Sequence, residues 1–111
     1  MILFPFTINR SFLRYPSHPI TIPRRYVDYG ELEHMLRSSR EVYVSPPLGS
    51  PVQAVVRHGQ SGWGEYYQLQ LRTPLDDHGL EQDEMVVVKM FIADGRLEVA
   101  ILKGPWVLRA A

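Results

Sequence analysis

The chain has 111 residues, which is enough for one domain with its own core and too few for two. Apolar residues make up 45% and charged residues 22%, which is typical of a folded globular protein and excludes a disordered chain. The formal net charge is zero. Because cysteine is absent, disulfides, thiolate nucleophiles and cysteine-based zinc sites are excluded. We therefore expect a single domain over residues 1–111, held by its core alone, as suits a reducing cytoplasm.

The apolar start of the chain is short. It ends at Thr7, whereas a signal peptide needs a longer apolar stretch. No window of the sequence approaches the roughly 20 apolar residues of a membrane helix. We expect a soluble protein that does not enter a membrane.

Residues 3–26 contain two predicted strands separated by a basic loop. Alternating apolar residues predict a first strand over 3–9, and two prolines bracket a second strand over 19–23. The polar segment between them, from Arg10 to His18, is expected to be a loop.

One helix is predicted with some detail, over residues 29–38. Asp28 followed by Glu31 resembles a capping box, and an apolar stripe at helical spacing follows. Glu33 and Arg37 are four residues apart, which predicts an ion pair on one helix face.

The remaining sequence predicts short strands separated by turns. A glycine-rich loop over 58–64 is expected between two strands, and Asp94-Gly95 predicts a tight hairpin turn. The expected strands cover 41–45, 52–57, 65–71, 84–92 and 97–102, with a last short one near 107–108. The prediction is a mainly β fold of seven or eight strands with one or two short helices, a compact barrel-like or orthogonal arrangement.

Signatures of catalysis and metal binding are absent from the sequence. Ser61 lies in Gly-Gln-Ser-Gly-Trp, where Trp63 replaces the final glycine of the nucleophile elbow. The four histidines are scattered, and the acidic residues near 76–84 lack calcium-loop spacing. We expect no catalytic residue, no metal site and no cofactor.

Positive charge is concentrated in the first half of the chain. Residues 1–63 carry seven arginines and four acidic residues, whereas residues 64–111 carry five basic and eight acidic residues. Arginine makes forked contacts with phosphates and guanine edges, so a nucleic-acid surface is one interpretation. A mild charge gradient without function is the other.

Two segments combine basic, amide, hydroxyl and aromatic side chains, a mixture that contacts phosphates and base edges. The same composition is also common in loops without function. The candidate DNA-binding residues are Arg10, Ser11, Arg14, Tyr15, His18, Arg24, Arg25, Arg57, His58, Gln60, Ser61 and Trp63.

The order of these segments resembles a known family. Phe6-Thr-Ile-Asn, a basic loop and Ile20-Thr-Ile-Pro-Arg-Arg-Tyr26 are similar to the opening of the DNA-binding pseudobarrel. Leu80 to Val88 and Asp94-Gly-Arg-Leu-Glu-Val-Ala-Ile101 are similar to its closing half. This family includes the plant B-three-type transcription-factor domains and the recognition domains of EcoRII-like and BfiI-like restriction endonucleases, and AbrB/MazE-like domains share some of its elements.

The resemblance implies an open pseudobarrel that grips the major groove of double-stranded DNA with two arms. Carried over by position, the arms would be residues 10–17 and 57–63, with Arg24 and Arg25 as flanking phosphate contacts. AbrB/MazE-like domains are about half this length and form intertwined dimers, so a chain of this length suits a monomer. The expected protein is a regulator or a recognition module of a restriction system.

A second interpretation comes from the residues themselves. Net neutrality and several aromatic residues expected at the surface are also typical of a protein-interaction module, since tyrosine, tryptophan and arginine are enriched at interface hot spots. The aromatic residues concerned are Tyr15, Tyr29, Tyr43, Trp63 and Trp106. In that case the partner is a protein, and the chain is a complex subunit or an inhibitor of another enzyme.

Overall fold

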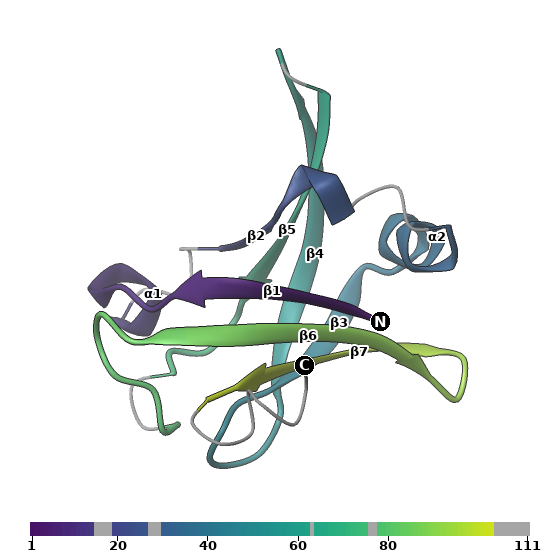
Figure 1. Cartoon of the computed structure of the whole chain (residues 1–111). Helices are drawn as coiled ribbons and strands as arrows, with labels where there is room; N and C mark the ends of the chain where they lie inside the picture. Colours follow the sequence, from purple (N-terminus) through teal and green to yellow (C-terminus); the bar gives the residue numbers. More distant parts are fainter. Residues whose placement is uncertain (15–18, 27–29, 63, 76–77, 104–111) are drawn as a thin grey trace.

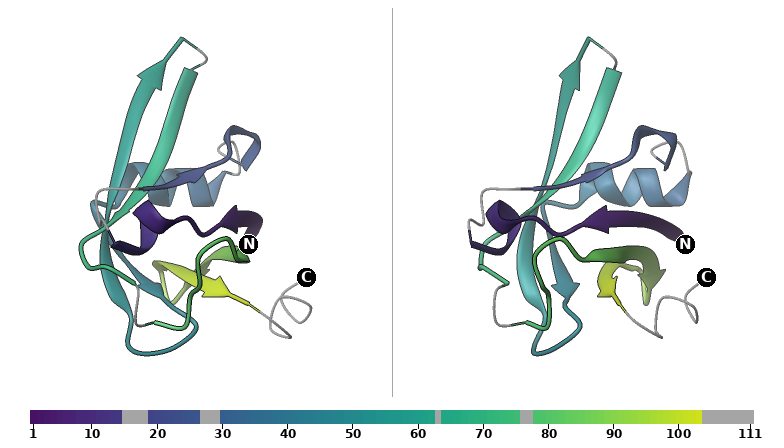
Figure 2. Two further views of the ribbon diagram at one scale, coloured as in Figure 1. Left: turned by 90° about the vertical axis from the view of Figure 1, so that its left-hand side faces the viewer. Right: turned by 60° about the vertical axis from the view of Figure 1, so that its left-hand side comes forward.

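Seven strands form one sheet that curves into a nearly closed barrel (Figures 1 and 2). The computed structural model describes residues 1–14, 19–26, 30–62, 64–75 and 78–103. The strand order is β1-β6-β7-β3-β4-β5-β2, with β3 and β7 parallel and all other neighbours antiparallel. The elements are β1 (Ile2–Thr7), α1 (Arg10–Arg14), β2 (Ile20–Ile22), η1 (Arg24–Tyr26), α2 (Glu31–Ser38), β3 (Glu41–Ser45), β4 (Val52–Ser61), β5 (Gly64–Leu71), β6 (Met85–Ala93) and β7 (Arg96–Leu102).

The core lies inside the curved sheet and is built by alternation along the strands. Successive strand residues point to opposite faces, so every second residue enters the core. Two short helices add Phe12 and Leu36, both almost fully buried. The buried strand residues are Ile2, Phe4, Ile20, Ile22, Val42, Val44, Val52, Ala54, Val56, Tyr67, Leu69, Leu71, Val86, Val88, Met90, Leu97, Val99 and Ile101.

The predicted mainly β class is confirmed, and most strands lie where the alternation places them. The β6–β7 turn has the expected form, because Asp94 and Gly95 both adopt positive φ, at 52° and 74°. This backbone suits a two-residue hairpin turn between Ala93 and Arg96, which are paired across the ladder.

The segment after β1 differs from the sequence prediction. We expected a loop from Arg10 onward, but residues Arg10–Arg14 form the short helix α1. The side-chain Oδ1 of Asn9 accepts a hydrogen bond from the backbone N–H of Phe12 at 2.8 Å, which caps the helix N-terminus. Burial of Phe12 and Leu13 then holds a helix that is too short to be stable alone.

The start of α2 also differs from the prediction. The helix begins at Glu31 after Gly30, whose φ is 49° and which has no side chain to cap it. Asp28, the predicted cap, lies outside the described residues, as do Tyr29, Trp106 and the possible strand near 107–108. The predicted Glu33–Arg37 ion pair is confirmed, at 3.1 Å.

Among the residues that the structure describes, no helix is long and apolar enough to span a membrane.

Candidate nucleic-acid interface

The β4–β5 hairpin extends beyond the strands on either side of it. Strand pairing with β3 reaches Val55 of β4, and strand pairing with β2 reaches Tyr67 of β5. The outer part of the hairpin, residues 58–62 and 64–66, therefore has no third strand beside it, and we call it the ribbon. Figures 1 and 2 show it projecting away from the barrel.

The predicted glycine-rich loop over 58–64 is wrong in its extent. Strand pairing continues to the pair Ser61–Gly64, so the loop shrinks to the turn between these two residues. Two glycines of the ladder lack a side chain where a neighbouring side chain lies close to the backbone. A Cβ at Gly59 would lie 2.5 Å from the hydroxyl oxygen of Tyr66, and one at Gly64 would overlap the guanidinium of Arg24.

The ribbon has two chemically different faces. Alternation from buried Val56 assigns His58 and Gln60 to the inner face, which continues the core side of the sheet. Arg57, Gly59 and Ser61 then belong to the outer face. Register across the hairpin assigns Tyr66 and Gln68 to the outer face and Glu65 and Tyr67 to the inner face.

The outer face carries a row of polar groups across three strands. Arg57 is paired in register with Gln68, whose amide Nε2 donates a hydrogen bond to Oγ1 of Thr21 at 3.2 Å. Arg57, Thr21 and Arg24 are exposed. Arg57 and Arg24 make no ion pair with any residue in the described part of the chain.

The inner face is tied to α2 by charge. The Arg37 guanidinium contacts the carboxylate of Glu33 at 3.1 Å and that of Glu65 at 2.5 Å. The hydrogen bond that Arg37 donates to the Glu33 carboxylate and the charge of Glu65 both raise the pKa of Arg37. The negative charge that Glu65 brings to the ribbon is therefore compensated from within the protein.

Tyr67 lies under this network and is almost fully buried. Burial raises the pKa of Tyr67 above its ordinary value near 10, while the nearby Arg37 lowers it. The phenol is thus held neutral in the core, next to the tilted ring of His58 at 6.2 Å between ring centroids.

Replacing Tyr67 with phenylalanine is expected to flatten the alkaline part of the stability profile. With a folded-state pKa above the unfolded value, Tyr67 stabilises the fold fully below about pH 10 and loses this contribution as the pH rises through the folded pKa. Urea unfolding between pH 8 and 11 measures this. An equal alkaline loss in both proteins would show that Tyr67 does not cause it.

The two ribbon glycines are expected to respond differently to alanine. At Gly59 the added methyl meets only the far end of Tyr66, so the loss of stability should stay below about 1 kcal/mol while the Tyr66 ring moves. At Gly64, φ is 114°, and alanine adds backbone strain of about 1–3 kcal/mol. Denaturant unfolding and the Tyr66 ring NMR signals check both, and equal losses would contradict the prediction.

The described part of the first predicted arm, residues 10–14, does not lie beside the ribbon. Arg10 is exposed in α1, beside the end of β1 and well apart from the projecting end of the ribbon in both figures. The acidic turn 81–84 adjoins it, because the N–H of Asp83 donates to the carbonyl of Ile8 at 2.7 Å and the N–H of Ile8 donates to the carbonyl of Glu84 at 2.8 Å.

The structure brings together only part of the predicted set. Arg24 in η1 lies over Gly64 of the β4–β5 hairpin, and the same hairpin carries Arg57, His58, Gln60 and Ser61. Ser11 and Arg14 lie in α1 with Arg10, and Arg25 follows Arg24 in η1. The predicted residues Tyr15, His18 and Trp63 lie outside the described residues.

Three outer-face residues were missing from the sequence-based set: Thr21, Tyr66 and Gln68. The alternation of apolar residues within 65–71 places Tyr66 and Gln68 on the face opposite to Tyr67, Leu69 and Leu71. These two residues could therefore have been predicted from the sequence. Thr21 joins them only through the pairing of β2 with β5, which links residues 47 positions apart.

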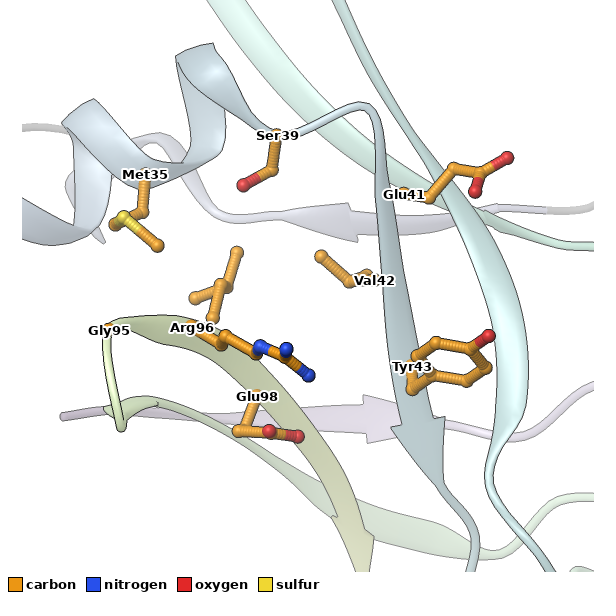
Figure 3. A pocket seen from close by; sticks show the side chains of 9 residues that line it. Met35, Ser39, Glu41, Val42, Tyr43, Gly95, Arg96 and Glu98 are labelled. Carbon is orange, nitrogen blue, oxygen red and sulfur yellow. The ribbon is translucent and has the colours of Figure 1, made fainter.

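A separate pocket of about 330 Å³ opens between α2, β3 and β7 (Figure 3). The described pairing of β3 with β7 begins at Val44, so the two strands diverge before it. Met35, Val42 and Leu97 contribute apolar surface, and the Arg96 side chain extends toward Tyr43. Such a pocket suits an apolar side chain that carries an acceptor group.

Within the described ranges, no cluster of histidine, aspartate and glutamate side chains could hold a metal ion. The architecture defines a class, a mainly β protein with a seven-stranded, nearly closed sheet and a projecting ribbon. Comparison of the chain with protein-family models, with curated proteins and with solved structures gives no match.

Proposed function

We propose that the chain is a non-enzymatic DNA-binding domain that inserts its ribbon into the major groove of double-stranded DNA. The observation that carries the proposal is the ribbon itself. A two-stranded β-ribbon fits the major groove, which is about 12 Å wide, and several DNA-binding proteins read bases in this way.

The charges on and beside the ribbon support this assignment. Arg57 is exposed on β4 and Arg24 and Arg25 are exposed in η1, while the acidic Glu65 is compensated by Arg37. Arginine side chains bind phosphates and guanine edges through forked hydrogen bonds. The resemblance to the pseudobarrel family points in the same direction, toward a monomeric cytoplasmic module of a regulator or a restriction system.

A salt titration of duplex binding tests the proposal and measures how much of the chain takes part. Each neutralised phosphate contributes about −0.9 to the slope of log affinity against log salt. Arg24, Arg25 and Arg57 then give a slope of roughly −3, and engagement of Arg10 and Arg14 as well gives roughly −5. Failure to bind any duplex at low salt would refute the proposal.

The second candidate function is a protein-interaction module, and the pocket beside Tyr43 favours it. Tyr43 is 57% exposed at the pocket rim, and tyrosine is enriched at the hot spots of protein interfaces. If this function holds, the chain co-purifies with a stoichiometric protein partner after nuclease treatment. Tyr43→Ala then releases that partner.

A further inference from the structure

The proposed function leaves open which side of the ribbon meets the DNA. A ribbon lying in a groove directs one face toward the base edges and the other away from them, because side chains alternate between the two faces. The two faces of this ribbon differ in charge, in accessibility and in their ties to the rest of the protein. These differences select one of them.

The inner face is already engaged within the protein. Glu65 is bound by Arg37 of α2, and Arg37 is held in turn by Glu33. A duplex on this side would place phosphates next to two carboxylates and would have to compete for Arg37. The His58 ring faces Tyr67, which is part of the core.

The outer face of the ribbon, in contrast, is free of acidic residues in its described part and is flanked by exposed arginines. The exposed Arg57 lies at its base, and the guanidinium of the exposed Arg24 lies over Gly64 near its outer end. On β3, the strand that pairs with β4, the acidic residue of this sheet face is Glu41, which Arg72 and Gln53 bind at 3.1 Å and 2.6 Å. Positive charge therefore dominates the outer face near the ribbon.

Two glycines shape the surface of the outer face. Gly59 leaves room for the Tyr66 hydroxyl, and Gly64 leaves room for the Arg24 guanidinium. Both side chains thus lie close against the backbone of the ribbon. The result is a low surface of guanidinium, phenol and amide groups that a groove can accommodate.

We infer that duplex DNA is contacted by the outer face of the ribbon and the adjoining edge of β2 and η1. This inference rests on the proposed function and specifies the side of the site that binds. Arg57, Gln68 and Thr21 form the row that faces the base edges, and Arg24 holds a flanking phosphate. Arg57 in this row gives a preference for guanine, the base that arginine contacts through two acceptors.

Neighbouring residues on opposite faces provide the test. Ser61→Glu and Gln60→Glu each add one negative charge, at almost the same distance from the barrel. Arg57→Gln and His58→Gln form a second adjacent pair. Binding is measured by fluorescence anisotropy with a labelled pool of random-sequence 20-bp duplexes at 50 mM salt, and circular dichroism confirms that each variant is folded.

We expect Arg57→Gln to weaken binding about 10-fold, as the loss of one charge-assisted contact implies. Ser61→Glu should weaken it by a similar factor, because it places a negative charge beside the DNA phosphates. The inner-face variants should stay within about 3-fold of the unsubstituted protein, in line with screened charges that make no contact. Equal or larger losses for Gln60→Glu and His58→Gln would overturn the assignment of the face and leave duplex binding intact. If the unsubstituted protein binds no duplex, the proposed function itself fails.

Discussion

Replacing residues 60–65 with Asn-Gly is expected to abolish most duplex binding without unfolding the protein. The new turn joins Gly59 to Tyr66, which are paired across the hairpin in the same way as Ser61 and Gly64. Affinity should fall at least about 10-fold, because the deletion removes Gly64, over which the Arg24 guanidinium lies, and shortens the ribbon that enters the groove. Anisotropy with the random duplex pool measures the change.

Stability should change little in this shortened protein. The removed residues contribute no member of the buried core among the described residues. The Arg37–Glu65 contact disappears, but both side chains are about half exposed, and such pairs contribute about 0–1 kcal/mol. Asp94→Asn is the matched control, since it creates an Asn-Gly turn in the β6–β7 hairpin and should alter neither property. Unchanged affinity in the shortened protein would contradict the role of the ribbon.

Much of the fold could be predicted because the strands alternate regularly. In β6 and β7 every second residue from Val86 to Met90 and from Leu97 to Ile101 is buried, and Asp94-Gly95 marks the turn between them. Local chemistry of this kind needs no knowledge of distant contacts. The same holds for Glu33 and Arg37, whose spacing along a helix is enough to bring them together.

The misplaced elements are those whose structure depends on distant contacts or on short segments. Five residues from Arg10 to Arg14 are too few to show a helical period, and α1 exists because Phe12 and Leu13 are buried. Three glycines between 58 and 64 suggested a loop. The ladder continues through Gly59 and Gly64, where Tyr66 and Arg24 fill the space that side chains would occupy, and Gly62 lies in the turn.

The candidate site was only partly predictable for a related reason. Arginine-bearing segments can be read from composition, but their mutual placement follows from strand pairing. The β2–β5 pairing brings Arg24 to the ribbon, whereas α1 carries Arg10 to the acidic turn 81–84. Charge patterning alone treats these arginines as equivalent.

The largest effect on stability is expected from Phe12→Ala. Phe12 is 1% exposed and packs edge-to-face on Phe6, with ring centroids 5.0 Å apart. Truncating a buried phenylalanine removes apolar burial and leaves a cavity, which costs about 3–5 kcal/mol. Since small domains have a total stability of about 5–15 kcal/mol, the variant should be close to unfolding at 37 °C.

Comparison with an exposed aromatic residue separates this packing effect from a general effect of losing a ring. Tyr43→Ala removes a ring of similar size that is 57% exposed, and it should cost less than about 1 kcal/mol. Phe12→Leu should recover more than half of the loss, because leucine refills most of the volume. Denaturant unfolding measures all three variants, analysed with one shared slope of the unfolding free energy against denaturant concentration. Similar losses at Phe12 and Tyr43 would mean that α1 does not anchor the barrel, and the helix would then be a surface feature without a structural role.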